Sequence, residues 1–148
     1  MFLIINDMEE EKFKYKVKQK VRFSDLDAMQ HVNNATYLSY LEEGRIGYFN
    51  HILNLPKNYL DFGAVVARIE INYLQPLIIG DEIEILTRVS KLGNKSSDVE
   101  NMIIVEREGN KIVAAEAVTK LVSYDFKKFI SVPIPEEIKN KIKEFERM

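Results

Sequence analysis

The residues with the clearest chemical potential lie between Arg22 and Arg45. Asp25 and Asp27 follow an alternating segment, and His31 comes four residues after Asp27. A helix is predicted to begin soon afterwards, and the unpaired N–H groups of a helix N-terminus can bind an anion or a developing oxyanion. A neighbouring carboxylate can attack a carbonyl carbon or deprotonate water. Together these groups suit the hydrolysis of an activated acyl group.

Other interpretations of the same residues stay open. Asp25 and Asp27 also suit a turn, because Asp side chains accept hydrogen bonds from nearby backbone groups, and His31 can hydrogen-bond to the backbone there. Asp and His are metal ligands too, but their spacing here matches no helix-face ligand motif, so we expect no metal. Cysteine chemistry is excluded, and no G-x-S-x-G, G-x-G-x-x-G or P-loop sequence occurs.

Length and composition limit the class of protein. The 148 residues suit one domain over 1–148, and 46% hydrophobic with 30% charged residues is typical of a soluble globular chain. With 21 basic and 23 acidic side chains, the net charge of −2 gives no drive toward nucleic acid. No apolar run approaches the roughly 20 residues of a membrane span. The N-terminal sequence MFLIINDMEEEKFK lacks the basic start of a signal peptide, so we expect a cytoplasmic protein without a membrane partner.

The segment Lys12–Phe23 alternates with period two, which predicts a strand with one buried face. The residues expected on the buried face are Phe13, Tyr15, Val17, Val21 and Phe23. Lysines occupy the other face. They suit a solvated edge strand that is protected against pairing with another chain, and phosphate contact is the alternative.

Residues 35–53 are predicted to form a long helix, with Asn33 or Asn34 as its N-cap. The apolar residues that fall near helical spacing are Leu38, Leu41, Tyr48, Phe49 and Ile52. Tyr37 and Tyr40 add aromatic bulk on other faces. A helix that is apolar on several sides is usually enclosed by the rest of the fold.

The remainder of the chain predicts four strands and a terminal helix. From Val65 to Tyr124 the period is two, with turn signals at Gln75-Pro76, Gly80-Asp81, Gly93-Asn94 and Gly109-Asn110. Glu136–Met148 suits a short amphipathic helix that begins after Pro135. The order predicts an α+β fold in which a five-stranded antiparallel sheet wraps around one long central helix, with a short C-terminal helix.

The segment from Arg22 onward resembles the 4-hydroxybenzoyl-CoA thioesterase family of the hot-dog fold. The residues that carry the family pattern are Arg22, Asp25, Asp27, His31, Val32, Asn33, Asn34, Ala35, Tyr37, Glu43 and Arg45. The HVNNA form is most similar to the long-chain acyl-CoA and acyl-ACP branches. The similarity continues through NYLQPLIIGDEI, KLGNKS and VPIPEEI.

The resemblance implies roles for individual residues. Asp27 would be the catalytic carboxylate, acting as nucleophile or general base. The backbone N–H groups from Val32 to Asn34 would form the oxyanion hole. His31 and Asn33 would line the site and position water or the acyl carbonyl, and Tyr37 would face the acyl group.

The resemblance also implies how coenzyme A and partner chains are arranged. The hairpin residues Lys95, Ser96 and Ser97 would lie near the pantetheine and nucleotide, where Lys95 could meet a phosphate as a point charge. An ordinary exposed hairpin lysine is the alternative. No cofactor is expected beyond coenzyme A as part of the substrate, and a homodimer or homotetramer would carry its sites at the dimer interface.

Two departures from the family pattern bear on the substrate. Met29 stands where plant acyl-ACP thioesterases have Asn, and Gln30-His31 stands where the aromatic-CoA branch has Gly. The expected activity is hydrolysis of a fatty acyl-CoA. The alternatives are an acyl-ACP thioesterase and a non-catalytic acyl-thioester binding protein of the same fold.

Overall fold

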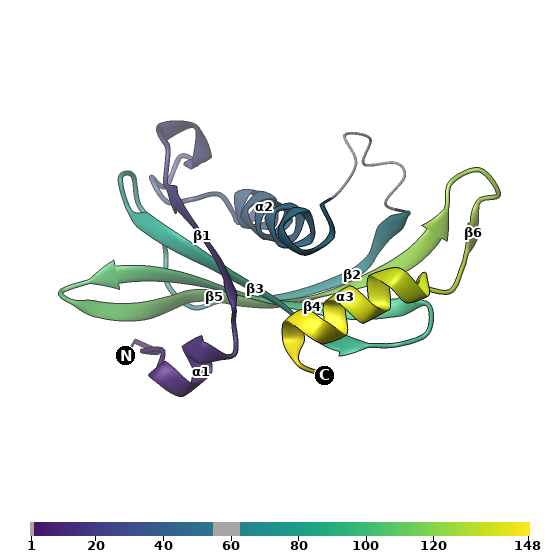
Figure 1. Cartoon of the computed structure of the whole chain (residues 1–148). Coiled ribbons are helices and arrows are strands. Elements are labelled where there is room, and N and C mark those ends of the chain that lie inside the picture. Colours follow the sequence, from purple (N-terminus) through teal and green to yellow (C-terminus); the bar gives the residue numbers. More distant parts are fainter. Residues whose placement is uncertain (1, 55–62) are drawn as a thin grey trace.

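The computed structural model describes residues 2–54 and 63–148 as an antiparallel sheet curled beneath a long helix (Figure 1). The elements in chain order are α1 (Asp7–Glu11), β1 (Tyr15–Lys20), the 3-10 turn η1 (Phe23–Asp25), α2 (Asn34–Leu53), β2 (Ala64–Tyr73), β3 (Glu82–Leu92), β4 (Ser96–Arg107), β5 (Asn110–Asp125), β6 (Ile130–Ser131) and α3 (Glu136–Glu146).

The sheet runs in the order β1-β3-β4-β5-β2, and every pair is antiparallel. The short strand β6 pairs with the end of β5 and was not predicted. β1 and β2 are therefore the two edges of the sheet, and β2 follows α2 in the chain although it lies across the sheet from β1. The predicted α+β architecture, with five long strands and one long helix, is confirmed.

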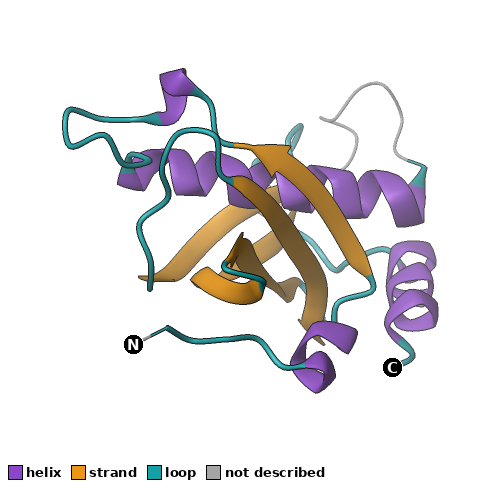
Figure 2. Cartoon of the chain, turned by 90° about the vertical axis from the view of Figure 1, so that its left-hand side faces the viewer, coloured by secondary structure: helices purple, strands orange, loops and turns teal. Residues whose placement is uncertain are grey.

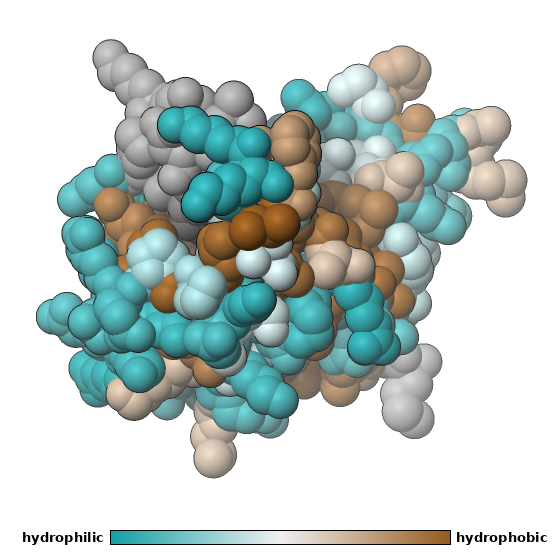
Figure 3. Space-filling model, turned by 90° about the vertical axis from the view of Figure 1, so that its right-hand side faces the viewer, coloured by the Kyte–Doolittle hydropathy of each residue, from teal (hydrophilic) through white to brown (hydrophobic). Residues whose placement is uncertain are grey.

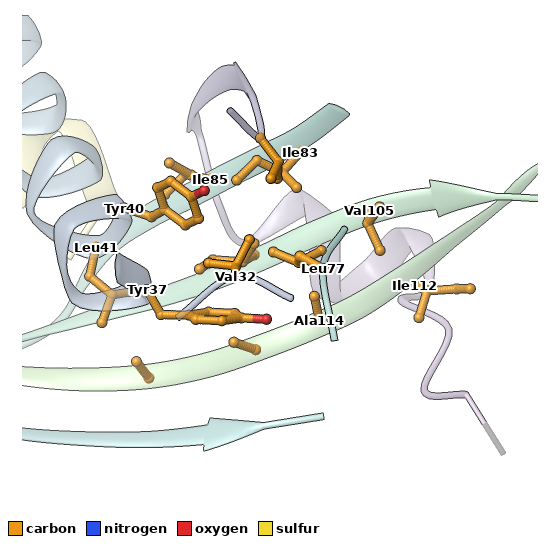
Figure 4. Close-up of a cluster of buried hydrophobic side chains, with 14 residues drawn as sticks. Val32, Tyr37, Tyr40, Leu41, Leu77, Ile83, Ile85, Val105, Ile112 and Ala114 are labelled. Carbon is orange, nitrogen blue, oxygen red and sulfur yellow. The ribbon is translucent and has the colours of Figure 1, made fainter. Parts of the chain in front are cut away.

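Helix α2 lies across the inner face of the curved strands (Figure 2). Its buried residues are Tyr37, Tyr40, Leu41, Gly44, Arg45, Tyr48 and Phe49. Tyr37 and Tyr40 point toward the strands and belong to the main core (Figure 4), whereas Leu38 is 38% exposed. The predicted buried face is therefore wrong at both Tyr residues and at Leu38. The prediction that the helix is enclosed is also wrong for a single chain, because the sheet covers only one side of α2.

The first strand is shorter than predicted, and the predicted alternation of exposure is kept along Tyr15–Lys20. Phe13 packs on the outer face of the sheet, in a cluster with Ile5, Leu86 and Met102. At the other end the chain leaves the sheet at Val21, whose N–H donates to the Asp81 carbonyl. Phe23 then falls in η1 and is 80% exposed. Placing Phe13 and Phe23 on the face of Val17 was wrong, because both lie beyond the segment that pairs with β3.

The C-terminal helix begins directly after Pro135, as predicted, and packs against the end of α2. The buried Tyr48 hydroxyl donates to Glu146 Oε1 at 2.7 Å. Burial and this bond raise the pKa of Tyr48. No helix within residues 2–54 and 63–148 is long and apolar enough to cross a membrane.

Gly44 marks the closest approach of α2 to the sheet. A Cβ placed there would lie 2.7 Å from both Ile85 Cγ2 and Thr87 Oγ1, and 3.2 Å from Asn101 Nδ2. These neighbours are fully buried and cannot move aside freely. Glycine is therefore required at this position for packing.

Replacing Gly44 by Ala tests that requirement. Alanine improves helix propensity by about 1 kcal/mol, but overpacking a core typically costs about 1–3 kcal/mol. We expect Gly44→Ala to lower the free energy of unfolding in urea, whereas Ser39→Ala on the exposed side of α2 stays within about 0.5 kcal/mol of wild type. A Gly44→Ala protein as stable as wild type would contradict the packing.

Candidate active site

A compact loop joins β1 to α2 and carries the predicted catalytic residues. Leu26 and Val32 form an isolated antiparallel bridge, and the Asp27 N–H donates to the His31 carbonyl at 2.9 Å. The Gln30 N–H donates to the Asp27 carbonyl, and Gln30 takes a left-handed conformation with φ 62°. Asp27 and His31 are therefore held side by side at the base of a tight turn.

Asp27 is exposed and lies at the edge of a pocket of about 370 Å³. Its Oδ1 accepts the Met29 N–H at 2.9 Å. Its Oδ2 makes no hydrogen bond to the part of the chain that the structure describes. One carboxylate oxygen is thus oriented by the turn, and the other remains available to a substrate or a water molecule.

The pocket lies between the loop, the start of α2 and the end of β2. Its lining residues are Asp27, Met29, His31, Val32, Asn34, Tyr37, Tyr73, Leu74, Gln75 and Pro76. Five of the predicted site residues are among them: Asp27, His31, Val32, Asn34 and Tyr37. Most of the lining is apolar or aromatic, which suits an acyl group beside a polar edge.

Asp25 is chemically similar to Asp27 but has a different environment. It is only 3% exposed. Its Oδ2 accepts the Arg22 N–H and the Tyr40 hydroxyl, at 2.9 and 2.8 Å, and its Oδ1 accepts Arg22 Nη2 at 3.1 Å. Burial by itself would raise the pKa of Asp25, but these three hydrogen bonds together hold it below its ordinary value. The turn interpretation is therefore right for Asp25, which acts structurally.

The alternative metal site is not formed by these residues. Both Asp25 oxygens are engaged with Arg22 and Tyr40, so Asp25 cannot join Asp27 and His31 as a ligand without losing those bonds. Across residues 2–54 and 63–148, no three His, Cys, Asp or Glu side chains are placed so that they could hold a metal ion.

The predicted oxyanion hole needs a correction. The Val32 N–H donates to the Leu77 carbonyl and the Asn33 N–H to the Asp25 carbonyl, both at 2.9 Å. These two N–H groups are therefore already used in hydrogen bonds that hold the loop. The Asn34 N–H, the first of α2, makes no hydrogen bond within the described chain. Of the three amides, it alone remains free to receive an oxyanion, with the helix dipole behind it.

Asn33 starts the helix, which is one of the two roles predicted for it. It is the N-cap of α2, and its Oδ1 accepts the Ala35 N–H at 2.8 Å. It is not among the residues that line the pocket. The sequence left the cap open between Asn33 and Asn34, and the structure assigns it to Asn33. The Asn33 Oδ1 is therefore committed to starting the helix.

Tyr73 is the first of four consecutive pocket residues, Tyr73 to Pro76, that the sequence did not place in the site. Its alternation with Ile69 and Ile71 suggested only a strand face. In the structure its ring lies 5.0 Å from the Tyr37 ring at 88°, and both line the pocket. The sequence signal for its location is the Gln75-Pro76 pair, which ends β2 beside the helix start. Only the pairing of β2 with β5 shows that this end meets the loop.

The predicted coenzyme A residues lie far from this pocket within one chain. Tyr73 pairs with Ala115 and Ser97 pairs with Leu121. These positions are six residues apart on β5, which is roughly 20 Å of strand. Lys95 is exposed, Ser96 half-buried and Ser97 buried. The opposite end of the molecule, seen in Figure 3, has an apolar band between hydrophilic flanks.

Arg45, the last residue of the predicted motif, is buried at 7% exposure between α2 and the sheet. Its Nη1 donates to Thr119 Oγ1 at 3.4 Å, and burial lowers its pKa. It does not line the pocket. The motif therefore combines residues of the site with residues that pack the helix.

Comparison with known proteins assigns this geometry to a class. The fold is shared with the crystal structure of a thioesterase complexed with coenzyme A and Zn from Thermus thermophilus. That chain is 36% identical, with a TM-score of 0.82, and the match covers 93% of this chain and 98% of that one. The probable thioesterase YbaW from Escherichia coli is 32% identical, with a TM-score of 0.71 over 87% of this chain and 96% of that one.

Sequence comparison leads to the same class. Long-chain acyl-CoA thioesterase FadM of Escherichia coli (strain K12) is 34% identical over 126 residues, which cover 84% of this chain and 94% of that protein. The model of the thioesterase-like superfamily matches residues 21–142. The protein is thus a thioester hydrolase of the hot-dog fold. It belongs to the thioesterase-like superfamily.

The predicted resemblance to 4-hydroxybenzoyl-CoA thioesterases is confirmed at the level of family. The crystal structure of a 4-hydroxybenzoyl CoA thioesterase mutant shares the fold, with a TM-score of 0.78 at 15% identity. The match covers 86% of this chain and 97% of that one. At this identity the likeness concerns the fold alone.

Substitution of Asp25 tests its structural role. Because its pKa is lowered in the folded state, its charge contributes stability above the ordinary carboxyl pKa, and that contribution is lost as the pH falls through the folded value. We expect Asp25→Asn to lower the free energy of unfolding by about 1–3 kcal/mol at pH 7. The difference from wild type should shrink below about pH 4.

The measurement is urea unfolding at several pH values. Tyr40→Phe, which removes one of the three hydrogen bonds, should show a smaller loss in the same direction. A difference between Asp25→Asn and wild type that is as large at pH 3 as at pH 7 would contradict a contribution from the ionised carboxylate.

Proposed function

We propose that the protein hydrolyses fatty acyl-CoA thioesters to the free acid and coenzyme A, with Asp27 as the catalytic carboxylate. The observation that carries the proposal is that two groups without hydrogen bonds in the described chain belong to residues lining the same pocket. Asp27 has a free oxygen, and the Asn34 N–H at the helix start is also free. A carboxylate beside an oxyanion donor is what thioester hydrolysis requires.

The chemistry at Asp27 follows one of two routes. As general base, Asp27 takes a proton from water while the hydroxyl oxygen adds to the thioester carbonyl. As nucleophile, its free oxygen adds to the carbonyl, loss of the thiolate from the adduct gives an anhydride, and water then hydrolyses the anhydride to the free acid and the Asp27 carboxylate. In both routes the carbonyl oxygen becomes an oxyanion that accepts the Asn34 N–H. The C–S bond then breaks, and the thiolate of coenzyme A leaves and takes up a proton.

His31 and the pocket lining supply the surroundings of this chemistry. His31 is exposed at the pocket edge, so its ring is accessible to a water molecule or to the thioester. Val32, Tyr37, Tyr73, Leu74 and Pro76 form the apolar wall, where an acyl chain would replace water. The printed name of the Escherichia coli relative, a long-chain acyl-CoA thioesterase, supports a fatty acyl group as substrate.

A homodimer formed through β2 completes the proposal. β2 is a ten-residue edge strand, one side of which pairs with no strand of residues 2–54 and 63–148, and Val66 is 46% exposed on it. Antiparallel pairing of two such strands about a twofold axis would place the Ala64 end of one beside the Tyr73 end of the other. The hairpin Lys95–Ser97 of one chain would then approach the pocket of its partner. In this arrangement the predicted coenzyme A residues of one chain would lie near the pocket of the other.

The first prediction from this function concerns Asp27. We expect Asp27→Asn to reduce turnover of acyl-CoAs by on the order of 10²–10⁴-fold, because an amide neither attacks the thioester carbonyl nor deprotonates water well. Asp125→Asn is a matched control. Asp125 also accepts the N–H two residues ahead, at 2.8 Å, in a turn away from the pocket. The measurement is thiol release from acyl-CoAs of graded length, with a low background because the chain has no Cys.

The outcomes separate the candidate functions. Turnover that collapses in Asp27→Asn and survives in Asp125→Asn supports the proposal. Full turnover in Asp27→Asn would reject Asp27 as the catalytic group. No release from any CoA ester, but release from acyl-carrier protein, would favour an acyl-ACP thioesterase. Binding without any release would favour a non-catalytic acyl-thioester binding protein.

A second prediction concerns the dimer. We expect Val66→Lys to weaken association, because lysine on an edge strand opposes pairing with another chain. Sedimentation velocity should show wild type as a dimer or larger, and Val66→Lys shifted toward monomer with reduced turnover. Val118→Lys is the control, since Val118 is also partly exposed but lies on the interior strand β5. A monomeric, active wild type would reject the shared site.

A further inference from the structure

Tyr73 occupies the junction between the edge strand β2 and the start of α2. It is the last residue of β2 and is 44% exposed, whereas its neighbour Tyr37 is 3% exposed. The Tyr37 hydroxyl donates to the Gln75 carbonyl at 3.2 Å, so that ring is fixed by both burial and hydrogen bonding. The edge-to-face contact between the two rings makes Tyr73 the outer, more exposed member of an aromatic pair at the pocket.

The hydroxyl of Tyr73 makes a specific bond to the helix start. It donates to the Asn34 carbonyl oxygen at 3.1 Å. Asn34 is the residue whose N–H is free, while the amides of Val32 and Asn33 are occupied. The bond therefore ties residue Asn34 to the sheet through its carbonyl, one peptide group after the free N–H, and the Asn33 cap holds the same turn from the other side.

We propose that Tyr73 is both a positioning residue for the oxyanion-binding amide and the side wall that limits the acyl group. Its hydroxyl restrains Asn34, so that the Asn34 N–H keeps its direction when charge develops on the thioester oxygen. Its ring closes the pocket between β2 and α2, where Leu74 and Pro76 continue the wall. This inference rests on the proposed function and adds to it the residue that determines acyl specificity.

The two roles can be separated by two substitutions. Tyr73→Phe keeps the ring and its contact with Tyr37 but removes the bond to Asn34. Loss of one neutral hydrogen bond corresponds to roughly two- to tenfold. We expect kcat to fall by that factor while KM changes little, because the restrained amide acts on the oxyanion rather than on the bound ester. Tyr73→Ala also removes the wall, and its preferred acyl length should shift to longer chains.

The control is Tyr124→Phe. Tyr124 is a partly buried tyrosine near the far end of β5, with its ring against Phe126 and no hydrogen bond from its hydroxyl within the described chain. All variants are assayed by thiol release across acyl-CoAs of graded length, together with their melting temperatures. A purely structural role for Tyr73 would lower the melting temperature while leaving kcat, KM and the length profile of the folded enzyme unchanged.

Failure of this proposal and failure of the proposed function give different outcomes. A lower kcat in Tyr73→Phe and a shifted length profile in Tyr73→Ala, with Tyr124→Phe like wild type, support both roles. Wild-type kcat in Tyr73→Phe overturns the positioning role, and an unchanged profile in Tyr73→Ala overturns the wall.

If wild type itself releases no thiol, the proposed function fails. Equilibrium binding of the same acyl-CoAs then tests the wall on its own. The same Kd at every acyl length in Tyr73→Ala and wild type would overturn it.

Discussion

The buried carboxylate of Asp25 holds together the parts from which the site is built. It accepts hydrogen bonds from the Arg22 backbone, the Arg22 guanidinium and the Tyr40 hydroxyl, and its own carbonyl accepts the Asn33 N–H. Through these bonds the end of the first strand, the body of α2 and the cap of α2 share one anchor. A buried charge is tolerated here because every bond it needs is supplied within the chain.

This anchor explains why two aspartates only two residues apart differ in chemistry. Asp25 points into the core and uses both oxygens for structure, whereas Asp27 is exposed and uses one oxygen to accept the Met29 N–H. The same loop also occupies the amides of Val32 and Asn33, which leaves the Asn34 N–H as the free donor. The folding of the loop thus selects one carboxylate and one amide for the pocket.

The pocket is built from segments that the sheet topology joins. β2 reaches the loop because it pairs with β5 at the edge opposite β1, and its last residues complete the wall begun by Tyr37. The same topology leaves the unpaired side of β2 exposed and puts the Lys95–Ser97 hairpin at the other end of the sheet. The pocket is therefore partly open in a single chain. In the proposed dimer, a second chain paired at β2 would bring its Lys95–Ser97 hairpin to the pocket of the first chain.

The sequence by itself determined the element order, the antiparallel sheet and the motif from Arg22 to Arg45. Period-two and helical spacing are local properties, and the spacing of Asp25, Asp27 and His31 resembles a known family. Spacing alone could not separate Asp25 from Asp27, and only the resemblance favoured Asp27 as the catalytic carboxylate. The sequence also did not place Tyr37 and Tyr40 in the core or Tyr73 in the site. Those assignments depend on burial, on hydrogen bonds between residues distant in the chain, and on which strand ends meet the helix, and only the tertiary structure decides them.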